Sequence, residues 1–580
     1  MIEVRNNLMD RMVAAVSPER GLKRMAARAT LAAATSLSSG GSPTEPGGRL
    51  FGRGSYNAAN SSRRQTRNWF ARPRSANADY IGGQKTLVGR SIDAWENMPM
   101  GTAAIERRVT FTIGTGLMAI PEIDAAAVGV APDQVAAIAA RIATDYDEYM
   151  ASTDPDAERT STGYGLQDVI YRGALLGGDI LQVRVMPESQ PGRRSSTSWK
   201  LYEAHWIVSP MGHLEGEVLT SGEGAGNVCV AGVEMDAYSA PVAFHVLKKD
   251  PGSFGYRMVD DTVRIPAWGE KTDLPTAVHI MIKLRAAQAR GVPLLAPVLE
   301  TLKQVSDLTE AELFAAVLTA MLAIIYKSPG AEAMPEPEYG TDPIVTGQEG
   351  YDPTPAARSD YRMEAGTTWE IDSDAEVDMK SPGRPNPAFD PFFMGLMRQL
   401  SAAIETPVEV LLLHFLSSYT ASRAAFETFY TLVRKSREWL ASHSESPRYR
   451  AWLFEQVARG RYKLPGFLAD ADKRAAWGKV RFRGDGKISM DPAREAKALE
   501  IHEAHGWRTG QEITAELTGG DYDANVTRRG LEHARFIELG LPIPNVVGGG
   551  NGLPEATDTT DNIAGSGSGG SSGGDKGGNN

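Results

Sequence analysis

The amino-acid sequence predicts an α+β fold in which a mixed domain precedes two long amphipathic helices. Short apolar runs between Gly, Pro and Asp turns predict β-strands within residues 76–293. Apolar residues then keep helical spacing over residues 294–327, and a second helical pattern covers residues 388–404. The chain has 580 residues, which is enough for several folded units around one or two large cores.

Composition narrows the class of protein. The net charge of −11 argues against a chain that grips nucleic acid over most of its surface, because that task needs clustered cations. The single cysteine, Cys229, excludes an intramolecular disulfide and a multi-thiolate metal site. The longest strongly apolar stretch, residues 313–326, is shorter than the roughly 18–20 residues of a bilayer span, and the N-terminal region has no uninterrupted apolar run. We expect no membrane partner and no secretion.

The two ends of the chain are expected to be flexible. Residues 1–75 carry many arginines around the Ser/Gly/Pro-rich stretch 36–48, a composition that buries too little apolar surface to offset the entropy of ordering. This basic arm either has no role or touches DNA or a neighbouring subunit, and both interpretations remain open. Residues 541–580 are a Gly/Ser-rich tail that we expect to be disordered.

Residues 76–293 are predicted to form the mixed domain. The pattern of residues 91–112 indicates a helix that Pro99 should break or bend. A second helix, residues 166–176, leads through Gly177 and Gly178 into a strand at residues 180–185. Further strand-like runs cover residues 199–202, 232–235, 242–246, 262–265 and 277–282.

The two long helices flank a polar insertion. Residues 328–387 are rich in Pro, Gly and acidic residues, including a near-alternating acidic series. The second helix then opens with a strongly apolar stripe that begins at Phe389. We expect two rods separated by a projection.

The remaining chain is predicted to be mainly helical. Residues 405–420 contain Pro407 and the apolar run 410–416, and helical patterns follow at residues 421–440 and 448–459.

A hairpin is predicted in the region after these helices. Its two strands are expected at residues 477–483 and 488–490, joined by the turn Gly484-Asp485-Gly486. Asp491 is an acceptable N-cap for a helix to about residue 505, and a last helix covers residues 522–539.

Catalytic and metal-binding motifs are weak. Lys271-Thr272 lacks the glycine spacing of a phosphate-binding loop, so the chain is not predicted to be an ATPase. The glycines of residues 221–226 indicate a loop rather than a dinucleotide site. His502 and His505 share a predicted helix face without a third ligand. We therefore expect a structural protein, no enzyme, that needs no cofactor.

A series of segments in fixed order carries a family resemblance. The segments are Tyr56-Asn57-Ala58-Ala59, Arg63-Arg64, Asn68-Trp69, Arg74-Ser75-Ala76-Asn77-Ala78-Asp79, Ile113-Gly114-Thr115-Gly116-Leu117, Leu175–Asp179, Gly232-Val233-Glu234-Met235-Asp236, Pro241-Val242-Ala243-Phe244, Arg264-Ile265-Pro266-Ala267, the run 288–297, Asn386-Pro387 through Phe392, and the run 417–425. With these segments the sequence resembles the lambda-type portal family of tailed phages over about residues 55–540. It departs from the family pattern at Gly177-Gly178-Asp179, where an Asp-Gly-Glu type turn is usual, and at Ser418-Tyr419-Thr420-Ala421, where Asn-Tyr-Ser-Ser is usual.

The resemblance implies a portal-type subunit with an α/β wing, a two-helix stem, a small α/β clip and a helical crown. The expected parts are a flexible basic arm (1–75), the wing (76–293), stem helix 1 (294–327), the clip (328–387), stem helix 2 (388–404), a tunnel loop (405–420), a tunnel helix with a return to the wing (421–490), the crown (491–540) and the disordered tail (541–580).

The implied function is that of a portal protein. About twelve copies would form a ring at one capsid vertex, the channel for packaging and ejection of double-stranded DNA independent of its sequence. The implied partners are other copies of the chain, the terminase large subunit, the major capsid and scaffold proteins, and later head-completion or adaptor proteins. The expected location is the virion, with the host cytoplasm during assembly.

Two sets of site residues follow from this resemblance. The candidates for the DNA channel are Arg398, Val410, Leu411, Leu412, Leu413, His414, Arg423, Arg434 and Lys435, with Arg437 on the same helix. The candidates for the clip surface that faces terminase and adaptors are Glu370, Asp372, Asp374, Glu376 and Asp378. Each of the cations is as well explained by ordinary solvation or by ion pairing between subunits.

Two other classes of function remain as alternatives. A phage-encoded DNA-processing enzyme such as a nuclease, or a protease, would use the acidic series near Asp372 or the His502 pair. A DNA-binding adaptor would use the basic arm of residues 1–75.

Overall fold

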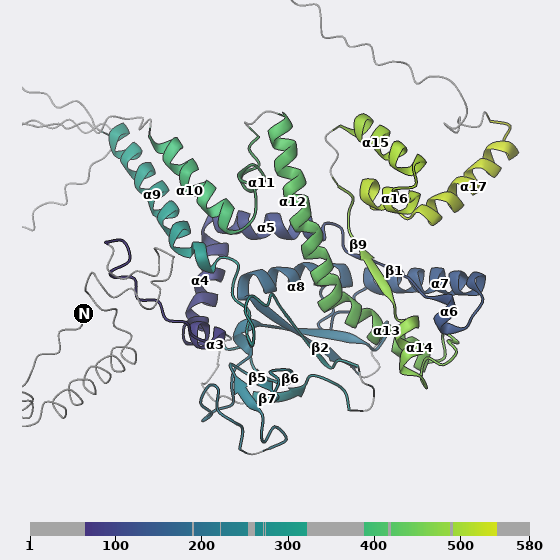
Figure 1. Cartoon of the computed structure of the whole chain (residues 1–580), viewed down its shortest axis with the longest axis horizontal. Helices are drawn as coiled ribbons and strands as arrows, with labels where there is room; N and C mark the ends of the chain where they lie inside the picture. Colours follow the sequence, from purple (N-terminus) through teal and green to yellow (C-terminus); the bar gives the residue numbers. More distant parts are fainter. Residues whose placement is uncertain are drawn as a thin grey trace, which may run out of the picture. The chain divides into compact units, whose positions relative to one another are not determined.

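The computed structural model describes residues 64–187, 191–220, 222–252, 262–270, 272, 274–321, 388–415, 419–487 and 491–541. The chain divides into two units, Met1–Ser75 and Ala76–Asn580. In the first unit, residues 64–68 form turns. Every helix and strand discussed below belongs to the second unit (Figure 1). The expected clip and Gly/Ser tail, and most of the expected basic arm, lie outside the described residues.

Proline 99 separates two helices at the start of the second unit. After α3 (Ala76–Tyr80) and the short η2 (Ile81–Gly83), α4 (Gln84–Asn97) and α5 (Pro99–Ile113) meet at Met98, which is extended. A proline disfavours helical backbone in the residue before it but suits the first position of a new helix. The predicted break at Pro99 is therefore confirmed.

The first sheet lies beneath α8 (Gly163–Gly177). Its central strand β2 (Asp179–Val185) pairs antiparallel with β3 (Ser198–Glu203) on one side and β8 (Ala277–Met281) on the other. The helix predicted at residues 166–176 and the strand at 180–185 are confirmed. Side chains from α5, α8, β2 and β8 share one buried cluster, which continues into the long helices described below.

A second sheet has the order β4 (Val228–Val230), β5 (Val233–Met235), β6 (Pro241–Leu247), β7 (Thr262–Pro266), with every pair antiparallel. One apolar cluster is shared by side chains from this sheet and from β2 and β8 of the first. The strand-like runs of the sequence correspond to β3, β5, β6, β7 and β8, whereas β4 was not predicted.

Protonation of the second sheet should make stability depend on pH. His245 lies 3.4 Å from the buried Glu234, which also accepts hydrogen bonds from Arg264. Burial lowers the pKa of His245, although the charge of Glu234 opposes this, and Arg264 and His213 lower it further. For Glu234, burial raises the pKa but the bonds from Arg264 and Asn227 outweigh it, so the pKa is lowered.

Both shifts make the folded state bind fewer protons than the unfolded state, so acid destabilises it. Stability should fall as the pH drops below about 6.5, the pKa of an ordinary histidine, and fall again as carboxylates such as Glu234 are protonated below about pH 4.5. In urea titrations from pH 8 to pH 5, the variant His245→Gln should show a shallower pH dependence than the unmodified chain. An unchanged slope would contradict the assignment to His245.

An aromatic core joins three helices that were not predicted to the helix predicted at residues 448–459. It lies between α6 (Ala125–Val128), α7 (Pro132–Ala151), α13 (Ser446–Ala458) and α14 (Ala471–Trp477). The ring of Trp452 lies 5.1 Å from that of Tyr146 and 5.9 Å from that of Tyr149, between centroids. This cluster joins α13 and α14 to α6 and α7, which lie more than 290 residues earlier in the chain.

The predicted hairpin at residues 477–490 stays a prediction, whereas its first strand has a partner that was not predicted. Strand β9 (Val480–Arg483) pairs antiparallel with β1 (Met118–Pro121), far earlier in the chain, and the expected second strand at 488–490 lies outside the described residues. The Gly484–Gly486 sequence serves close packing: the Asp485 carboxylate accepts a hydrogen bond from the Thr115 backbone N–H at 2.8 Å.

The long helices come next in the chain. η4 (Ala296–Val298) leads into α9 (Leu299–Met321), and after the undescribed insertion come α10 (Phe389–Ala403), the short α11 (Val408–Leu412) and α12 (Tyr419–Leu440). α12 continues through a π-helical turn, Ala441–Glu445, into α13. The predicted interruption near Ser446 is thus a widened turn inside a continuous helix.

Three helices close the described chain: α15 (Pro492–Ala504), α16 (Gly510–Thr518) and α17 (Tyr522–Glu538). Asp491 caps α15 by accepting from the Arg494 N–H, as predicted. α16 was not predicted, although Thr509 and Glu512 form a capping box at its start.

Candidate functional site

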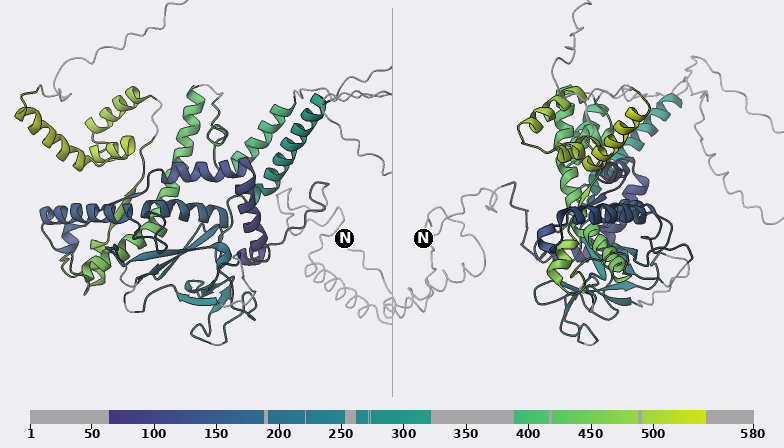
Figure 2. Two further views of the ribbon diagram at one scale, coloured as in Figure 1. Left: turned by 180° about the vertical axis from the view of Figure 1, so that it is seen from behind. Right: turned by 90° about the vertical axis from the view of Figure 1, so that its right-hand side faces the viewer.

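Helices α9 and α10 lie side by side and run antiparallel (Figures 1 and 2). Leu302 and Val305 near the start of α9 and Met397 and Leu400 near the end of α10 are all buried in one cluster. Because the beginning of one helix meets the end of the other, the chain leaves and re-enters the main buried cluster at the same place.

The other ends of these two helices carry exposed apolar side chains. Leu313 is 65% exposed, Phe314 64% and Val317 41% on α9, and Phe392 is 58% exposed on α10. Contiguous exposure of large apolar groups is unfavourable in water and is typical of surfaces that contact another protein.

A buried ion pair fixes the chain just before α9. The Arg290 guanidinium donates to both carboxylate oxygens of Asp179, at 2.7 and 2.9 Å, and Asp179 also accepts from the Gly291 N–H at 2.8 Å. Arg290 further donates to the carbonyls of Ala204, Ile207 and Ala231. Both charged side chains are essentially inaccessible to solvent.

The electrostatics of this pair favour its charged form. Burial by itself would raise the pKa of Asp179, but the adjacent Arg290 and the ring of His279, 3.2 Å away, hold that pKa far below its usual range. A buried carboxylate stays ionised only with such charge and hydrogen-bond compensation.

Two glycines let this pair form. Gly178 has φ +85°, and a Cβ on Gly291 would lie 1.9 Å from the Gly178 carbonyl oxygen. A side chain on Gly291 would clash with the Gly178 backbone. The turn before β2 and the segment that leads to α9 are therefore in direct backbone contact.

The segment of residues 405–415 connects α10 to α12. Thr406 is buried, Pro407 precedes α11, and Leu413 ends that helix in the left-handed region at φ +50°. The rings of Phe415 and Phe426 stack with centroids 5.4 Å apart.

The structure divides the apolar channel candidates. Val410 and Leu411 are buried within the subunit, against α12 and the main core respectively. Leu412 is half-buried, whereas Leu413 and His414 are exposed.

The cationic channel candidates also differ in their exposure and in their partners. Arg398, Arg434 and Lys435 are exposed. Arg423 lies 3.5 Å from Glu495 of α15, in an ion pair. Arg437 is bound by backbone carbonyls: it donates to Thr112 at 2.7 Å, to Phe111 at 3.0 Å and to Asp485 at 2.7 Å. Its role is therefore structural.

The clip candidates Glu370, Asp372, Asp374, Glu376 and Asp378 lie outside the described residues.

The enzymatic alternatives gain no geometric support. Among the described residues, no group of three or more His, Cys, Asp or Glu side chains is placed to hold a metal. His505 and His502 pack against the Trp507 ring, with centroids 4.9 and 5.5 Å away. Cys229 is buried, and burial raises the pKa of its thiol. Within the described part of the chain, no helix has the length and apolar character needed to cross a membrane.

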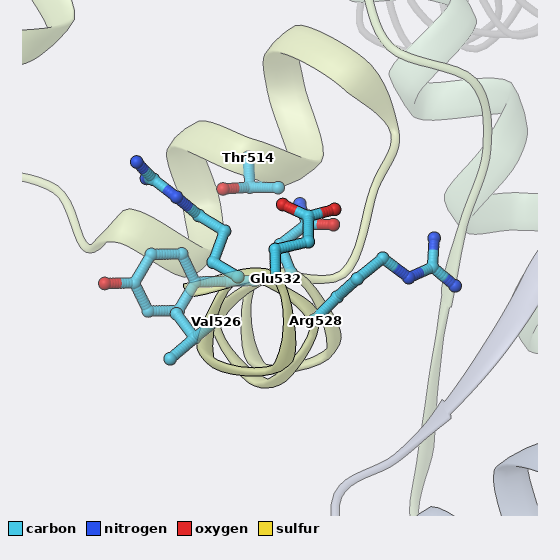
Figure 3. A pocket seen from close by; sticks show the side chains of 7 residues that line it. Thr514, Val526, Arg528 and Glu532 are labelled. Atoms are coloured by element: carbon cyan, nitrogen blue, oxygen red, sulfur yellow. The ribbon is translucent and has the colours of Figure 1, made fainter. Parts of the chain in front are cut away.

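A shallow hollow of about 300 Å³ lies between α16 and α17 (Figure 3). Thr514, Val526, Arg528 and Glu532 are among its lining residues, and Arg528 extends away from Thr514.

Comparison with known protein families identifies the family of this chain. Residues 62–437 match the model of the family described as phage portal protein, lambda family. The match covers more than half of the chain. The chain belongs to the lambda family of phage portal proteins. The resemblance noted in the sequence is thereby confirmed.

Individual relatives of this portal-family chain are distant. The portal protein of Escherichia phage N15 is 22% identical over 325 residues, and portal protein B of Escherichia phage lambda is 22% identical over 334 residues. Each alignment covers 54% of this chain, and the chain spans only about 60% of the length of these relatives.

Similar solved structures come from gene transfer agent particles. A chain of the virion of a native particle has a TM-score of 0.37 at 15% identity, covering 81% of this chain and 98% of that one. A chain of the neck of a native particle, computed with C12 symmetry, has a TM-score of 0.32 at 17% identity, covering 70% and 95%. At these TM-scores the likeness supports no argument about this chain.

Sequence reasoning missed two buried ion pairs, one just before α9 and one at the π-helical turn after α12. Arg290 and Asp179 were noted only as parts of family segments, and Glu445 and Arg448, a second fully buried ion pair at the π-helical turn, were not singled out. For Asp179 and Arg290 an available signal was a charged residue beside a glycine, whereas the sequence around Glu445 and Arg448 offers no such signal.

Proposed function

We propose that this chain is the subunit of a closed ring at one capsid vertex, through which double-stranded DNA enters during packaging and leaves during ejection. Its membership of the lambda portal family supports this role. The observation that carries the proposal is the pair of antiparallel helices α9 and α10, buried at one end and exposing Leu313, Phe314 and Phe392 at the other.

Ring formation would cover those exposed side chains. In a closed ring each subunit contacts its neighbours through two different faces, so an apolar patch on one face needs a complementary patch on another. The stem helices of neighbouring copies supply such faces. About twelve copies are expected from the family, and the ring forms a structural channel rather than an enzyme.

The bore is proposed to hold DNA loosely. The subunit carries a net charge of −11, so many copies repel a polyanion on average. The exposed Arg398, Arg434 and Lys435 supply local attraction, and Leu413 and His414 supply a low-affinity contact at the loop between α10 and α12. Weak, sequence-independent contact permits sliding.

Each proposed partner is assigned to one proposed part of the subunit. The acidic clip candidates, Glu370 to Asp378, are proposed to face the terminase large subunit during packaging and head-completion or adaptor proteins afterwards. Major capsid and scaffold proteins are proposed to surround the wing. The ring assembles in the host cytoplasm and becomes part of the virion.

Assembly of purified protein tests the proposal. Light scattering and negative-stain images should show a ring with a central hole. The double variant Leu313→Ser with Phe314→Ser should shift the protein to subunits or small oligomers, raising the concentration needed for ring formation by at least about tenfold, because several apolar contacts are lost at every interface.

A matched control keeps this test specific. Leu468→Ser changes an exposed apolar residue, 54% accessible, away from the stem helices and should assemble normally. Circular dichroism should show that both variants remain folded. A chain that stays monomeric at high concentration, or a stem variant that assembles like the control, would contradict the proposal.

A further inference from the structure

The segment Gly484–Lys487, here called the strap, links β9 to the three C-terminal helices α15–α17, here called the crown. It packs closely against α12 on one side and against the end of α16 on the other. A Cβ on Gly484 would lie 2.9 Å from Nε of Arg437, and a Cβ on Gly486 would lie 2.6 Å from the carbonyl oxygen of Leu517. The two glycines therefore allow contact on both sides of the strap.

On one side the strap is bound to α12 and to the end of α5. Arg437 of α12 donates to the Asp485 carbonyl at 2.7 Å and to the Thr112 carbonyl at 2.7 Å. The Asp485 carboxylate accepts from the Thr115 N–H at 2.8 Å. One guanidinium thus joins α12, α5 and the strap.

On the other side the strap is bound to the crown. The Lys487 N–H donates to the Glu516 carbonyl at 2.8 Å, at the end of α16. The Lys487 ammonium forms an ion pair with Glu427 of α12. One turn away on α12, Arg423 reaches Glu495 of α15 at 3.5 Å. Residues 423 and 427 are four apart and so share one face of the helix.

A neighbouring face of α12 packs on the 405–415 segment. Phe429 and Val433 are buried with Val410 in one cluster, and the rings of Phe426 and Phe415 stack. α12 therefore contacts the 405–415 segment with apolar side chains and the strap and crown with charged ones.

We propose that α12 couples the 405–415 segment to the crown, so that a displacement of this segment changes the stability of the strap and crown through the ion pairs of Glu427 and Arg423. Since the segment is a proposed DNA contact, the biological meaning of the coupling rests on the proposed function. The coupling itself is a property of the single chain. Rigid helices held by packed and ionic contacts at both ends can carry such coupling.

Hydrogen exchange of the full-length protein, followed by mass spectrometry of peptides, measures this coupling. Phe415→Ser alters a half-exposed contact to α12 and should speed exchange in peptides of residues 484–487 and 491–541 by about two- to fivefold, the scale set by exposed ion pairs. In the background Glu427→Lys, which breaks the pair with Lys487, the response of the crown to the same change should be clearly reduced, with the Arg423–Glu495 pair carrying what remains. Adding Lys487→Glu to that background restores opposite charges and should restore the response.

The pair Lys303–Asp307 of α9 is the matched control, because it is an exposed ion pair with no contact to the strap. Exchanging those two charges should leave the response to Phe415→Ser intact. A response confined to residues 405–440, or one that survives in Glu427→Lys at full size, would overturn the coupling. Rings that form without any coupling would leave the proposed function standing, whereas the absence of rings would reject that function whatever the exchange data show.

Discussion

Asp179→Asn should lower the free energy of unfolding by about 3–5 kcal/mol, because it leaves the Arg290 guanidinium buried with its charge uncompensated. Asp179 and Arg290 are almost fully inaccessible and joined by two hydrogen bonds, so water cannot replace the lost partner. The loss should appear as a lower midpoint in urea, followed by tryptophan fluorescence at fixed protein concentration.

A surface pair provides the comparison for this variant. Glu122 and Arg481 are 2.9 Å apart with both side chains partly exposed, so Glu122→Gln should cost no more than about 1 kcal/mol. Replacing both members of the buried pair, Asp179→Asn with Arg290→Met, should recover part of the loss, although three carbonyls then lose a donor. Equal effects of Asp179→Asn and Glu122→Gln would show that the buried pair does not fix the start of α9.

Trp452→Ala should destabilise the folded chain by about 3–5 kcal/mol through the cavity it creates in the aromatic core. Its ring is 1% exposed and lies within about 6 Å, between centroids, of the rings of Tyr146, Tyr149 and Tyr462. Because the same cluster joins α7 to α13, hydrogen exchange in both helices should accelerate together.

The control for this change is Trp268→Ala, which removes a tryptophan that is 61% exposed. It should shift the urea midpoint little. If Trp452→Ala accelerated exchange in α13 alone, the aromatic cluster would not be the contact that holds α7 and α13 together.

The local elements were predictable because their signals are local. The helix at residues 166–176 and the strand at 180–185 follow from apolar periodicity and from two intervening glycines, and the structure has them as α8 and β2. Pro99 and Asp491 act within a few residues of their own position, through backbone geometry and capping, and both were assigned correctly.

Pairings and contacts between segments far apart in the sequence were not predicted. The Gly484-Asp485-Gly486 sequence is typical of a hairpin turn, yet β9 pairs with β1, and the glycines instead allow contact with Arg437 and Leu517. Strand pairing depends on which edge is free in three dimensions, and turn residues alone do not decide this. The helix α7 was not predicted, and its buried stripe, which runs from Val135 to Met150, has a partner only once α13 packs against it.

The candidate site shows the same division. The sequence by itself determined the family, the two long helices before and after residues 328–387, and the cations of the helix at residues 421–440, because these depend on residue type and spacing along the chain. Only the tertiary structure decided that Arg434 is exposed while Arg437, three residues later, is held by three carbonyls, and that Val410 is buried while Leu413 is not. The physical reason is that exposure and charge compensation are set by segments far away in sequence, which no local pattern of side chains specifies.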